Sequence, residues 1–381
     1  MKKFTKKDRP KMKKIGVYIH IPFCKQKCYY CDFVSFAKQE DFQKEYFEAL
    51  KNEIKDFFSE NSNYEISTIY IGGGTPSFVD ENYIKEILDL IPKDNAKEIT
   101  IEVNPGTVNL EKLKLYKNIG INRLSIGLQS TQNNLLKQIG RIHNYEDFLN
   151  TYNMAKEIGF NNINVDLMIG LPNQTIQNIK QSLEIITNLN PKHISVYSLI
   201  VEEGTKMAEL INNGSLILPN EELERNMYWY VKNYLELKGY SHYEISNFAQ
   251  KGYESKHNLD CWNQKEYVGF GLAAHSYINN VRFSNAENFD EYLKNYKNSK
   301  IIQEEQDEMN KKKEYMLLGL RKIKGVSIQE FKNKFGENPI FLFKDILNKL
   351  VNEKLIIVDN DNIKLTNKGI DLANLVWEEF V

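Results

Sequence analysis

The sequence has few cysteines and almost no net charge. Only four of its 381 residues are Cys, and three of them lie within eight residues of each other, which is not the even, spaced set of a disulfide-linked secreted protein. The 50 basic and 51 acidic residues give a formal net charge of -1, so the chain as a whole has no electrostatic attraction to nucleic acid. These two features exclude a disulfide scaffold and favour the reducing cytoplasm.

No long apolar run follows the basic N-terminal segment MKKFTKKDRPKMKK, so residues 1–14 predict neither a signal peptide nor a membrane span. We interpret this segment as a flexible, solvated leader, with contact to an anionic surface as the less favoured alternative. We therefore expect a cytoplasmic protein with at most peripheral membrane contact. The remaining pattern predicts a core domain over residues 15–285 and a smaller domain over residues 286–381.

Strand and helix patterns alternate through the first half of the chain. Apolar, β-rich runs occur at residues 15–21, 66–72, 98–104, 123–128, 162–170 and 193–199, and amphipathic helical spacing occurs at residues 41–58, 84–90, 110–119, 148–158 and 176–189. Six successive strand–helix units predict an α/β fold with parallel strands, either an open sheet or a partial (β/α)6 barrel. Polar and Gly residues follow the strand ends, where such folds bind ligands.

The pattern after residue 285 resembles a winged helix in outline, an α+β arrangement with helical segments and a short pair of strands. Residues 301–381 carry 13 Lys or Arg against 14 Asp or Glu, so the basic excess of a DNA-binding domain is absent. We interpret this region as a structural or partner-docking domain and expect no nucleic-acid partner.

Cys24, Cys28 and Cys31 form the pattern C-x3-C-x2-C directly after the first predicted strand. Closely spaced thiolates can bind one metal centre. One candidate is a zinc site that recruits His20 or a distant residue as its fourth ligand. The other is a 4Fe-4S cluster with one iron left open for a small molecule. Zinc sites usually combine two separated C-x2-C pairs, so the spacing favours the cluster.

This cysteine loop, with Tyr30 before the third cysteine, resembles that of the radical S-adenosylmethionine (SAM) superfamily. Over residues 16–285 the chain resembles, in order, the oxygen-independent coproporphyrinogen oxidases and their relatives. The motifs that carry this resemblance are YIHIPFC, GGGTP, IEVNPG, RLSIGLQS, GRIHN, VDLMIGLP, YEISNFA and GFGLAAHSY. The resemblance implies a 4Fe-4S cluster on the three cysteines and one or two bound SAM molecules.

The same resemblance assigns SAM contacts to individual residues. The first molecule would contact Tyr18, Gly73 and Glu102, and the second would contact Tyr30, Gly74, Thr75, Gln129, Arg141 and Asp166. Glu102 ends a buried strand, where an unpaired carboxylate is costly, so we expect it to have a cationic or hydroxyl partner. Without the resemblance, a structural ion pair between Arg141 and Asp166 is an equal alternative, and Asp32 is a turn residue.

Two departures from the oxidases point to the haem-chaperone branch of this family. The oxidases carry a further cysteine two residues after the third, where this chain has Phe33, and they have a longer N-terminal extension. The resemblance then implies haem as cargo, haem-accepting proteins as partners and an electron donor. The alternatives are an enzyme of porphyrin biosynthesis that oxidises coproporphyrinogen III, or another radical reaction on a tetrapyrrole.

The haem-chaperone branch typically carries H-N-x-x-Y-W, and this chain has HNLDCW from His257 to Trp262. His257 is a candidate haem ligand, and hydrogen bonding within a loop is the equal alternative. Cys261 replaces a family Tyr and is more readily explained as a small buried residue than as an iron ligand. If residues 257–262 are helical, their four-residue spacing places His257 and Cys261 on one side of the helix. We expect His275 to order its loop, and His242 stays ambiguous.

Overall fold

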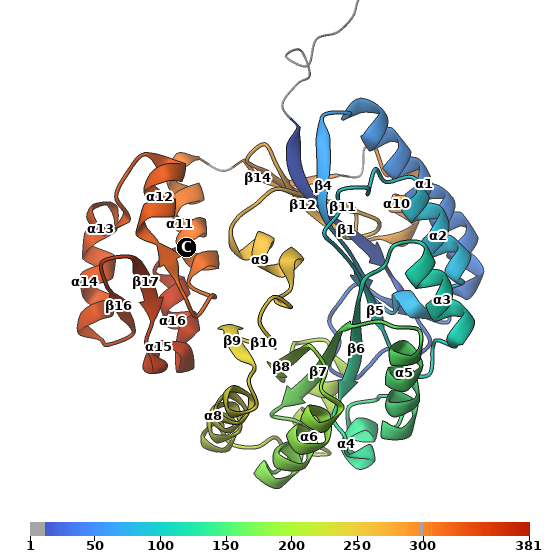
Figure 1. Cartoon of the computed structure of the whole chain (residues 1–381), viewed down its shortest axis with the longest axis horizontal. Coiled ribbons are helices and arrows are strands. Elements are labelled where there is room, and N and C mark those ends of the chain that lie inside the picture. Colours follow the sequence, from blue (N-terminus) through green and yellow to red (C-terminus); the bar gives the residue numbers. More distant parts are fainter. Residues whose placement is uncertain (1–11, 298–299, 306) are drawn as a thin grey trace, which may run out of the picture.

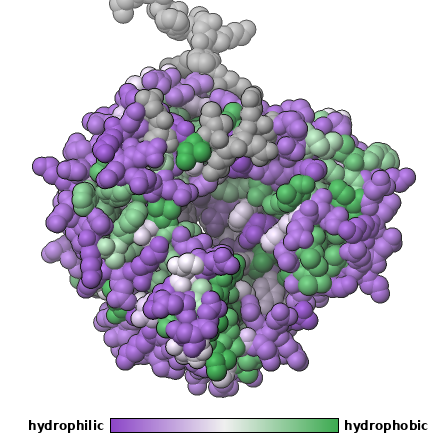
Figure 2. All heavy atoms as spheres, turned by 180° about the vertical axis from the view of Figure 1, so that it is seen from behind, coloured by the Kyte–Doolittle hydropathy of each residue, from purple (hydrophilic) through white to green (hydrophobic). Residues whose placement is uncertain are grey.

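Figure 1 shows the computed structural model, which describes residues 12–297, 300–305 and 307–381. Most of the predicted basic leader, residues 1–11, lies outside the described residues. Within the described ranges, no helix combines the length and apolar character needed to cross a bilayer. Figure 2 shows one face of the molecule, which is largely hydrophilic and is hollowed near its middle.

Six parallel strands, adjacent in chain order, form the centre of the molecule, as the sequence predicts. They are β1 (Lys13–Ile21), β4 (Tyr64–Gly73), β5 (Glu98–Val103), β6 (Arg123–Gln129), β7 (Asn162–Ile169) and β8 (His193–Ser198). Alternating side chains on these strands, such as Ile99, Ile101, Leu124 and Ile126, are buried. Strands covered on both faces read as nearly continuous apolar runs, which explains why the sequence locates them well.

The sheet is open rather than a closed barrel. Antiparallel strands extend it on both sides, in the order β14-β13-β12-β11-β1 at one side and β8-β10-β9 at the other. Their bounds are β9 Ser241–Glu244, β10 Asn247–Ala249, β11 Tyr267–Phe270, β12 His275–Ile278, β13 Val281–Ser284 and β14 Ile301–Glu305. Among these added strands, β11 pairs in parallel with β1, and the other added pairings are antiparallel. The fold is thus a partial (β/α)6 arrangement.

Helices cover the outer side of the curved sheet (Figure 1). They are α1 (Gln43–Glu60), α2 (Glu81–Asp89), α3 (Leu110–Asn118), α4 (Asn133–Gln138), α5 (Tyr145–Glu157), α6 (Ile176–Leu189) and α8 (Glu221–Leu237). Helix α7 (Lys206–Asn212) packs beside the cysteine loop, where the Met207 N–H donates to the Tyr29 carbonyl. Capping boxes begin α5 at Asn144 and α6 at Thr175. The sequence pattern missed α4, because a six-residue helix with two buried side chains is too short to show periodicity.

The C-terminal domain has its own hydrophobic core, which includes Met316, Phe331, Leu350 and Ile363. Its elements are α11 (Glu308–Gly319), β15 (Val326–Ser327), α12 (Ile328–Phe335), α13 (Pro339–Leu342), α14 (Lys344–Asn352), β16 (Ile356–Val358), β17 (Asn362–Leu365), α15 (Asn367–Asp371) and α16 (Ala373–Glu378). The last two helices are separate, because Leu372 between them leaves the helical conformation. The domain boundary at residue 285 stays a prediction.

Helix α10 (Phe289–Asn295) lies between most strands of the large sheet and this domain in sequence, and helix α9 (Lys256–Trp262) lies between them in space. Helix α10 packs against α1. Helix α9 contains the HNLDCW motif and contacts both β4 and α11. In Figure 1, α9 therefore lies between the parallel strands and the C-terminal domain.

Candidate functional site

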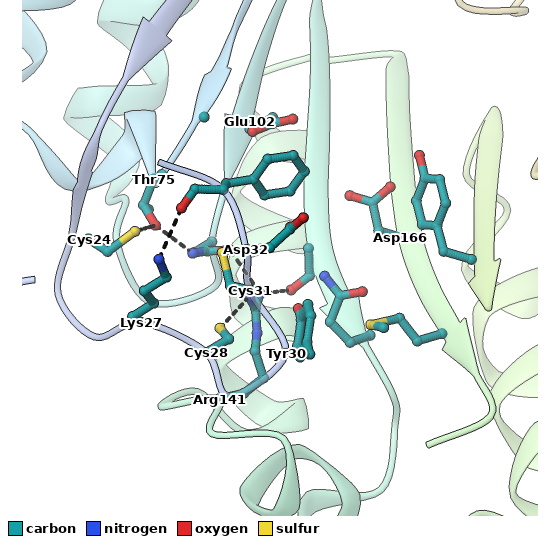
Figure 3. A pocket seen from close by; sticks show the side chains of 18 of the residues that line it. Cys24, Lys27, Cys28, Tyr30, Cys31, Asp32, Thr75, Glu102, Arg141 and Asp166 are labelled. Atoms are coloured by element: carbon teal, nitrogen blue, oxygen red, sulfur yellow. Dashed lines mark hydrogen bonds between the residues drawn. The ribbon is translucent and has the colours of Figure 1, made fainter. Parts of the chain in front are cut away.

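A cavity of about 450 Å³ opens at the carboxyl ends of the parallel strands (Figure 3). This volume lies in the range of small-molecule sites. The sequence-predicted residues that line it are Cys24, Cys28, Tyr30, Cys31, Asp32, Gly73, Gly74, Thr75, Glu102, Gln129, Arg141 and Asp166. The fold thus brings together residues that are up to 142 positions apart in the chain.

The three cysteines lie along one side of this cavity and form no disulfide. Cys24 belongs to the two-residue strand β2 (Phe23–Cys24), which pairs with β3 (Phe36–Ala37) and closes the base of the loop. Cys28 accepts a hydrogen bond from Arg141 Nη1 at 3.4 Å, and Cys31 Sγ lies 3.9 Å from Ser35 Oγ. In the described part of the chain, no three His, Cys, Asp or Glu side chains are arranged to hold a single metal ion.

Burial governs the protonation of these thiols. It raises the pKa of Cys24 and that of Cys31, so both are protonated in the metal-free protein at neutral pH. Metal ligation requires thiolates, and Thr75 Oγ1 already donates a hydrogen bond to Cys24 Sγ at 3.4 Å. Thr75 and Arg141 are thus positioned to stabilise negative charge on two of the three sulfurs.

The glycine turn after β4 is shaped by its neighbours. Gly73 has a φ of +111°, and a Cβ at this position would lie 2.7 Å from the His20 imidazole. A Cβ at Gly74 would lie 2.9 Å from the backbone of Pro22 and 3.0 Å from Cys24 Sγ. The Gly74 amide also donates to the Ile21 carbonyl at 2.8 Å. Glycine is therefore required for the close packing of the cysteine loop against β4.

Glu102 has the hydroxyl partner that its burial predicts. Tyr70 Oη donates to Glu102 Oε1 at 2.8 Å. Burial nevertheless raises the pKa of Glu102 to about 7, because the Tyr70 hydroxyl and the Gly73 backbone N–H compensate only part of the lost hydration. Among the described residues no Lys, Arg or His forms an ion pair with Glu102, so this side chain can accept a positively charged group of a ligand.

Arg141 and Asp166 do not form the ion pair that was the alternative prediction. Arg141 Nη2 donates to Asn104 Oδ1 at 2.8 Å and to the Gly127 carbonyl. Asp166 instead accepts from Asn164 Nδ2 at 2.7 Å and from Ser125 Oγ at 3.3 Å, and burial raises its pKa. Asp166 faces the cavity from β7, and Arg141 faces it from the loop between α4 and α5 (Figure 3).

Gln129 ends β6 with a strained backbone. Its φ is +71°, which is uncommon for a residue with a Cβ, and the ladder to β7 shifts register between Gly127 and Gln129. Such strain persists where the surroundings fix it, and it is concentrated at ligand sites. Here it accompanies a side chain that lines the cavity.

Tyr18 lies outside the cavity lining. Its hydroxyl lies 3.0 Å from His20 Nδ1, while His20 Nε2 lies 2.8 Å from the Val34 carbonyl. Since the carbonyl accepts from Nε2, we assign Tyr18 as the donor to Nδ1. Burial lowers the pKa of His20 to about 4, so His20 is a neutral group that orders the cysteine loop. Both of its nitrogens are occupied, which argues against the less favoured alternative in which His20 completes a zinc site.

Several lining residues were missed by the sequence analysis. They are chiefly Tyr70, Asn104, Ser125, Gly127, Met168 and Tyr197. Asn104, Gly127 and Met168 each lie two positions from a predicted residue, namely Glu102, Gln129 and Asp166, so they share its face of the strand. Extending each predicted position by two residues would have found them.

His257 lies near the opposite end of the sheet, outside the cavity lining. Its Nδ1 is 2.9 Å from Thr68 Oγ1, and its backbone N–H donates to Glu98 Oε1 at 3.0 Å. Glu98 Oε2 also accepts from the Lys256 N–H at 3.0 Å, so this buried carboxylate holds the start of α9. Burial lowers the pKa of His257 to about 4. Its assignment as a haem ligand stays a prediction.

The remaining candidate residues lie apart from the cavity as well. Cys261 is on α9 four residues after His257, which confirms the helical spacing, and burial raises its pKa to about 12. His242 stacks on Phe248 with ring centroids 4.5 Å apart. His275 is exposed at the start of β12.

The chain matches the family models of the radical SAM superfamily over residues 18–186 and of the HemN C-terminal domain over residues 308–372. It is 40% identical over 379 residues to heme chaperone HemW of Bacillus subtilis, which covers 96% of this chain and 99% of that protein. The chain belongs to the HemW family. The HemW of Lactococcus lactis is 38% identical over 96% of this chain and 97% of its own length.

The fold is also that of a solved HemN structure. Coproporphyrinogen III oxidase from Escherichia coli, a radical SAM enzyme, superposes with a TM-score of 0.85 over 98% of this chain and 91% of that chain. The two sequences are 22% identical, so this likeness confirms the α/β fold and its C-terminal domain. It carries no information about which reaction the HemW-family chain performs.

Proposed function

We propose that the chain is a haem chaperone of the radical SAM type, which binds haem and delivers it to acceptor proteins. The observation that carries this proposal is similarity to heme chaperone HemW along nearly the whole chain, at 40% and 38% identity. Phe33 at the position of the oxidases' further cysteine agrees with it. The chaperone would act in the cytoplasm with a separate electron donor.

We propose Cys24, Cys28 and Cys31 as the ligands of a 4Fe-4S cluster. Three thiols on one side of a cavity suit a cluster with one open iron, and Gly74 leaves the space that a side chain would fill beside Cys24. When bound, the cluster supplies the electron that cleaves SAM. Ser35, Thr75 and Arg141 next to the sulfurs provide the polar contacts that such a cluster needs.

The residues around the cavity fit SAM as well. Glu102 would accept the ammonium group, and the backbone of the Gly73–Gly74 turn would meet the amino-acid part of the first molecule. Tyr30, Thr75, Gln129, Arg141 and Asp166 would contact a second molecule. Since Tyr18 hydrogen bonds to His20 and its ring lies 6.4 Å from that of Tyr70, we propose that it supports the first site through these neighbours.

Haem titration into anaerobically reconstituted protein tests the chaperone function. A saturable Soret band, followed by its transfer to an apo-haemoprotein, is the expected result. Replacing residues 257–262 as a block tests whether α9 contributes to binding. No saturable binding by the intact chain would contradict the proposal.

The same preparation tests the alternative enzyme function. Incubation with coproporphyrinogen III, reductant and SAM should leave the porphyrinogen unchanged while SAM cleavage is monitored in parallel. Formation of protoporphyrinogen would show that the chain is an oxidase, which the HemN-like fold alone does not establish.

A further inference from the structure

A second cavity, of about 540 Å³, lies where α9 meets the C-terminal domain. The loop that ends α9 supplies Asn263 and Gln264, and the C-terminal domain supplies Tyr315, Lys322, Lys324 and Lys334. Gln264 joins the two parts, since its Nε2 donates to the Lys311 carbonyl at 3.0 Å and to Glu314 Oε2 at 2.7 Å. The cavity is therefore part of a bonded interface between two regions of the chain.

The lysines of this cavity are held by neutral groups. Lys322 Nζ donates to Asn263 Oδ1, and Lys334 Nζ donates to Gln264 Oε1 at 2.9 Å. Among the residues that the structure describes, none of Lys322, Lys324 and Lys334 has a carboxylate within ion-pair distance. The fourth lining lysine, Lys265, pairs with Asp260 at 2.5 Å.

In the described part of the chain, three of the four lining lysines therefore have no direct ion pair, although Glu314 and Glu266 act on Lys334 from a longer distance. Glu330 is the acidic member of the lining residues. Burial lowers the pKa of Lys322, and it lowers the pKa of Lys334 to about 8, even though much of the Lys334 side chain is exposed. Partial enclosure of an ammonium group without an anionic partner has this effect. A bound anion would raise the pKa of both lysines.

The gathering of lysines is local. Residues 301–381 contain 13 basic and 14 acidic residues, so composition alone predicts no positive site. The basic groups converge because the turn after α11 and the helix α12 both face the end of α9. Tyr315 belongs to the core of the C-terminal domain, and its ring supports Lys334, whose Nζ lies 4.8 Å from the ring centroid.

We propose that this cavity binds a ligand with paired anionic groups, and that in the loaded protein these groups are the two propionate carboxylates of haem. The second part rests on the proposed haem-chaperone function. Ammonium groups that converge on one cavity suit a ligand that carries two carboxylates on one edge, as haem does. The volume is within the range of small-ligand sites. An inorganic diphosphate presents the same anionic chemistry.

Haem binding to the full-length, cluster-loaded protein tests this site with two ligands and three variants. The ligands are haem and haem dimethyl ester, whose propionates carry no charge. The variants are Lys324→Gln, Lys322→Gln combined with Lys324→Gln, and the control Lys332→Gln, which is on α12 but does not line the cavity. The single variant removes an exposed side chain and leaves the Lys322–Asn263 contact intact.

We expect the double variant to bind haem about tenfold more weakly and the single variant to show part of this loss. The ester should bind weakly to every variant, and Lys332→Gln should match the unaltered chain. Pyrophosphate binding, measured by calorimetry, tests the anion site without haem. If only pyrophosphate depends on Lys322 and Lys324, the site serves phosphates and the haem assignment is wrong.

If neither ligand depends on these lysines, the proposal is overturned. If the unaltered chain binds no haem, the chaperone function fails, and the pyrophosphate measurement still decides whether the cavity binds anions.

Discussion

The two ends of the parallel sheet use polar side chains in different ways. At the carboxyl ends, Glu102 and Asp166 are partly buried with raised pKa values, and Gln129 has a left-handed backbone. At the amino ends, Glu98 and Thr68 are engaged with α9, where they hold the backbone and the imidazole of His257. At the carboxyl ends, unfavourable carboxyl groups and a strained backbone lie beside a cavity. At the amino ends, the polar groups hold α9 in place.

This difference separates two motifs that look equally functional in the sequence. The cysteine loop lies at the strained end, where a ligand can relieve the cost of buried carboxylates. The histidine of HNLDCW lies at the packed end with a hydroxyl partner already present. A change at the first end should therefore affect ligand binding, and a change at the second should first affect stability.

The largest expected effect is on the cysteine loop. Replacing any one of Cys24, Cys28 and Cys31 with Ser should reduce iron and sulfide from the content of a filled cluster to background, because three thiolates leave no spare ligand. Cys261→Ser is the matched control, since Cys261 is on α9 and away from the cavity. Metal and sulfide analysis after anaerobic reconstitution measures the effect. Full iron content in any of the three single variants would remove the cluster assignment.

The next effect is on the packed end. Glu98→Ala removes the acceptor of two backbone N–H groups at the start of α9 and should lower the free energy of unfolding by about 2–5 kcal/mol. Glu98→Gln keeps one acceptor and should cost less. Urea denaturation measures both variants.

Glu157→Ala, at an exposed position of α5, is the control for Glu98→Ala and should be close to neutral. An equally small loss in Glu98→Ala would show that α9 does not depend on this carboxylate. The contrast between the two ends of the sheet would then weaken.

Glu102 gives a pH-dependent effect at the strained end. Its pKa of about 7 exceeds the ordinary value of 4.5, so the folded state binds this proton more tightly than the unfolded state. The protonated Glu102 therefore contributes its full stabilisation below about pH 4.5, and this stabilisation is lost as the pH rises from 4.5 to about 7. The full loss corresponds to about 3 kcal/mol.

Glu102→Gln removes this titration. Without SAM, the variant should be more stable than the unaltered chain at pH 8, and this advantage should vanish near pH 4.5. The control Glu157→Gln should show the same dependence of stability on pH as the unaltered chain. Denaturation curves between pH 4.5 and 8 decide the matter, and parallel profiles for the Glu102 variant and the unaltered chain would contradict a raised pKa.

The smallest effect concerns Gln129. Gln129→Gly should relieve the left-handed strain and change the free energy of unfolding by at most about 1 kcal/mol, in the stabilising direction. The same change removes a side chain from the cavity and should weaken SAM binding. Thermal unfolding and equilibrium dialysis measure the two effects. A loss of stability would show that the side chain, and not the backbone, dominates at this position.

The sequence predicts the six parallel strands and the cavity residues well, for a physical reason. Buried parallel strands read as apolar runs, and the residues that follow them must meet at one edge of the sheet. The alternation along each strand then fixes which side chains share a face, although it does not fix their depth. Tyr18 is on the correct strand but contacts His20 instead of lining the cavity.

The position of α9 could not be predicted in this way. His257 meets Thr68 and Glu98, which precede it by 189 and 159 residues, and no local pattern encodes these contacts. The lysine cavity was missed for the same reason, since Asn263 and Lys322 belong to different domains as predicted from the sequence. Such long-range contacts require the folded structure.

The electron paramagnetic resonance spectrum of the reduced cluster, recorded with and without SAM, tests the central claim most directly. An iron that is open to the cavity should respond when SAM binds, so the spectrum should change, and Glu102→Gln should weaken that response. A spectrum that SAM leaves unaltered at saturating concentration would contradict the account.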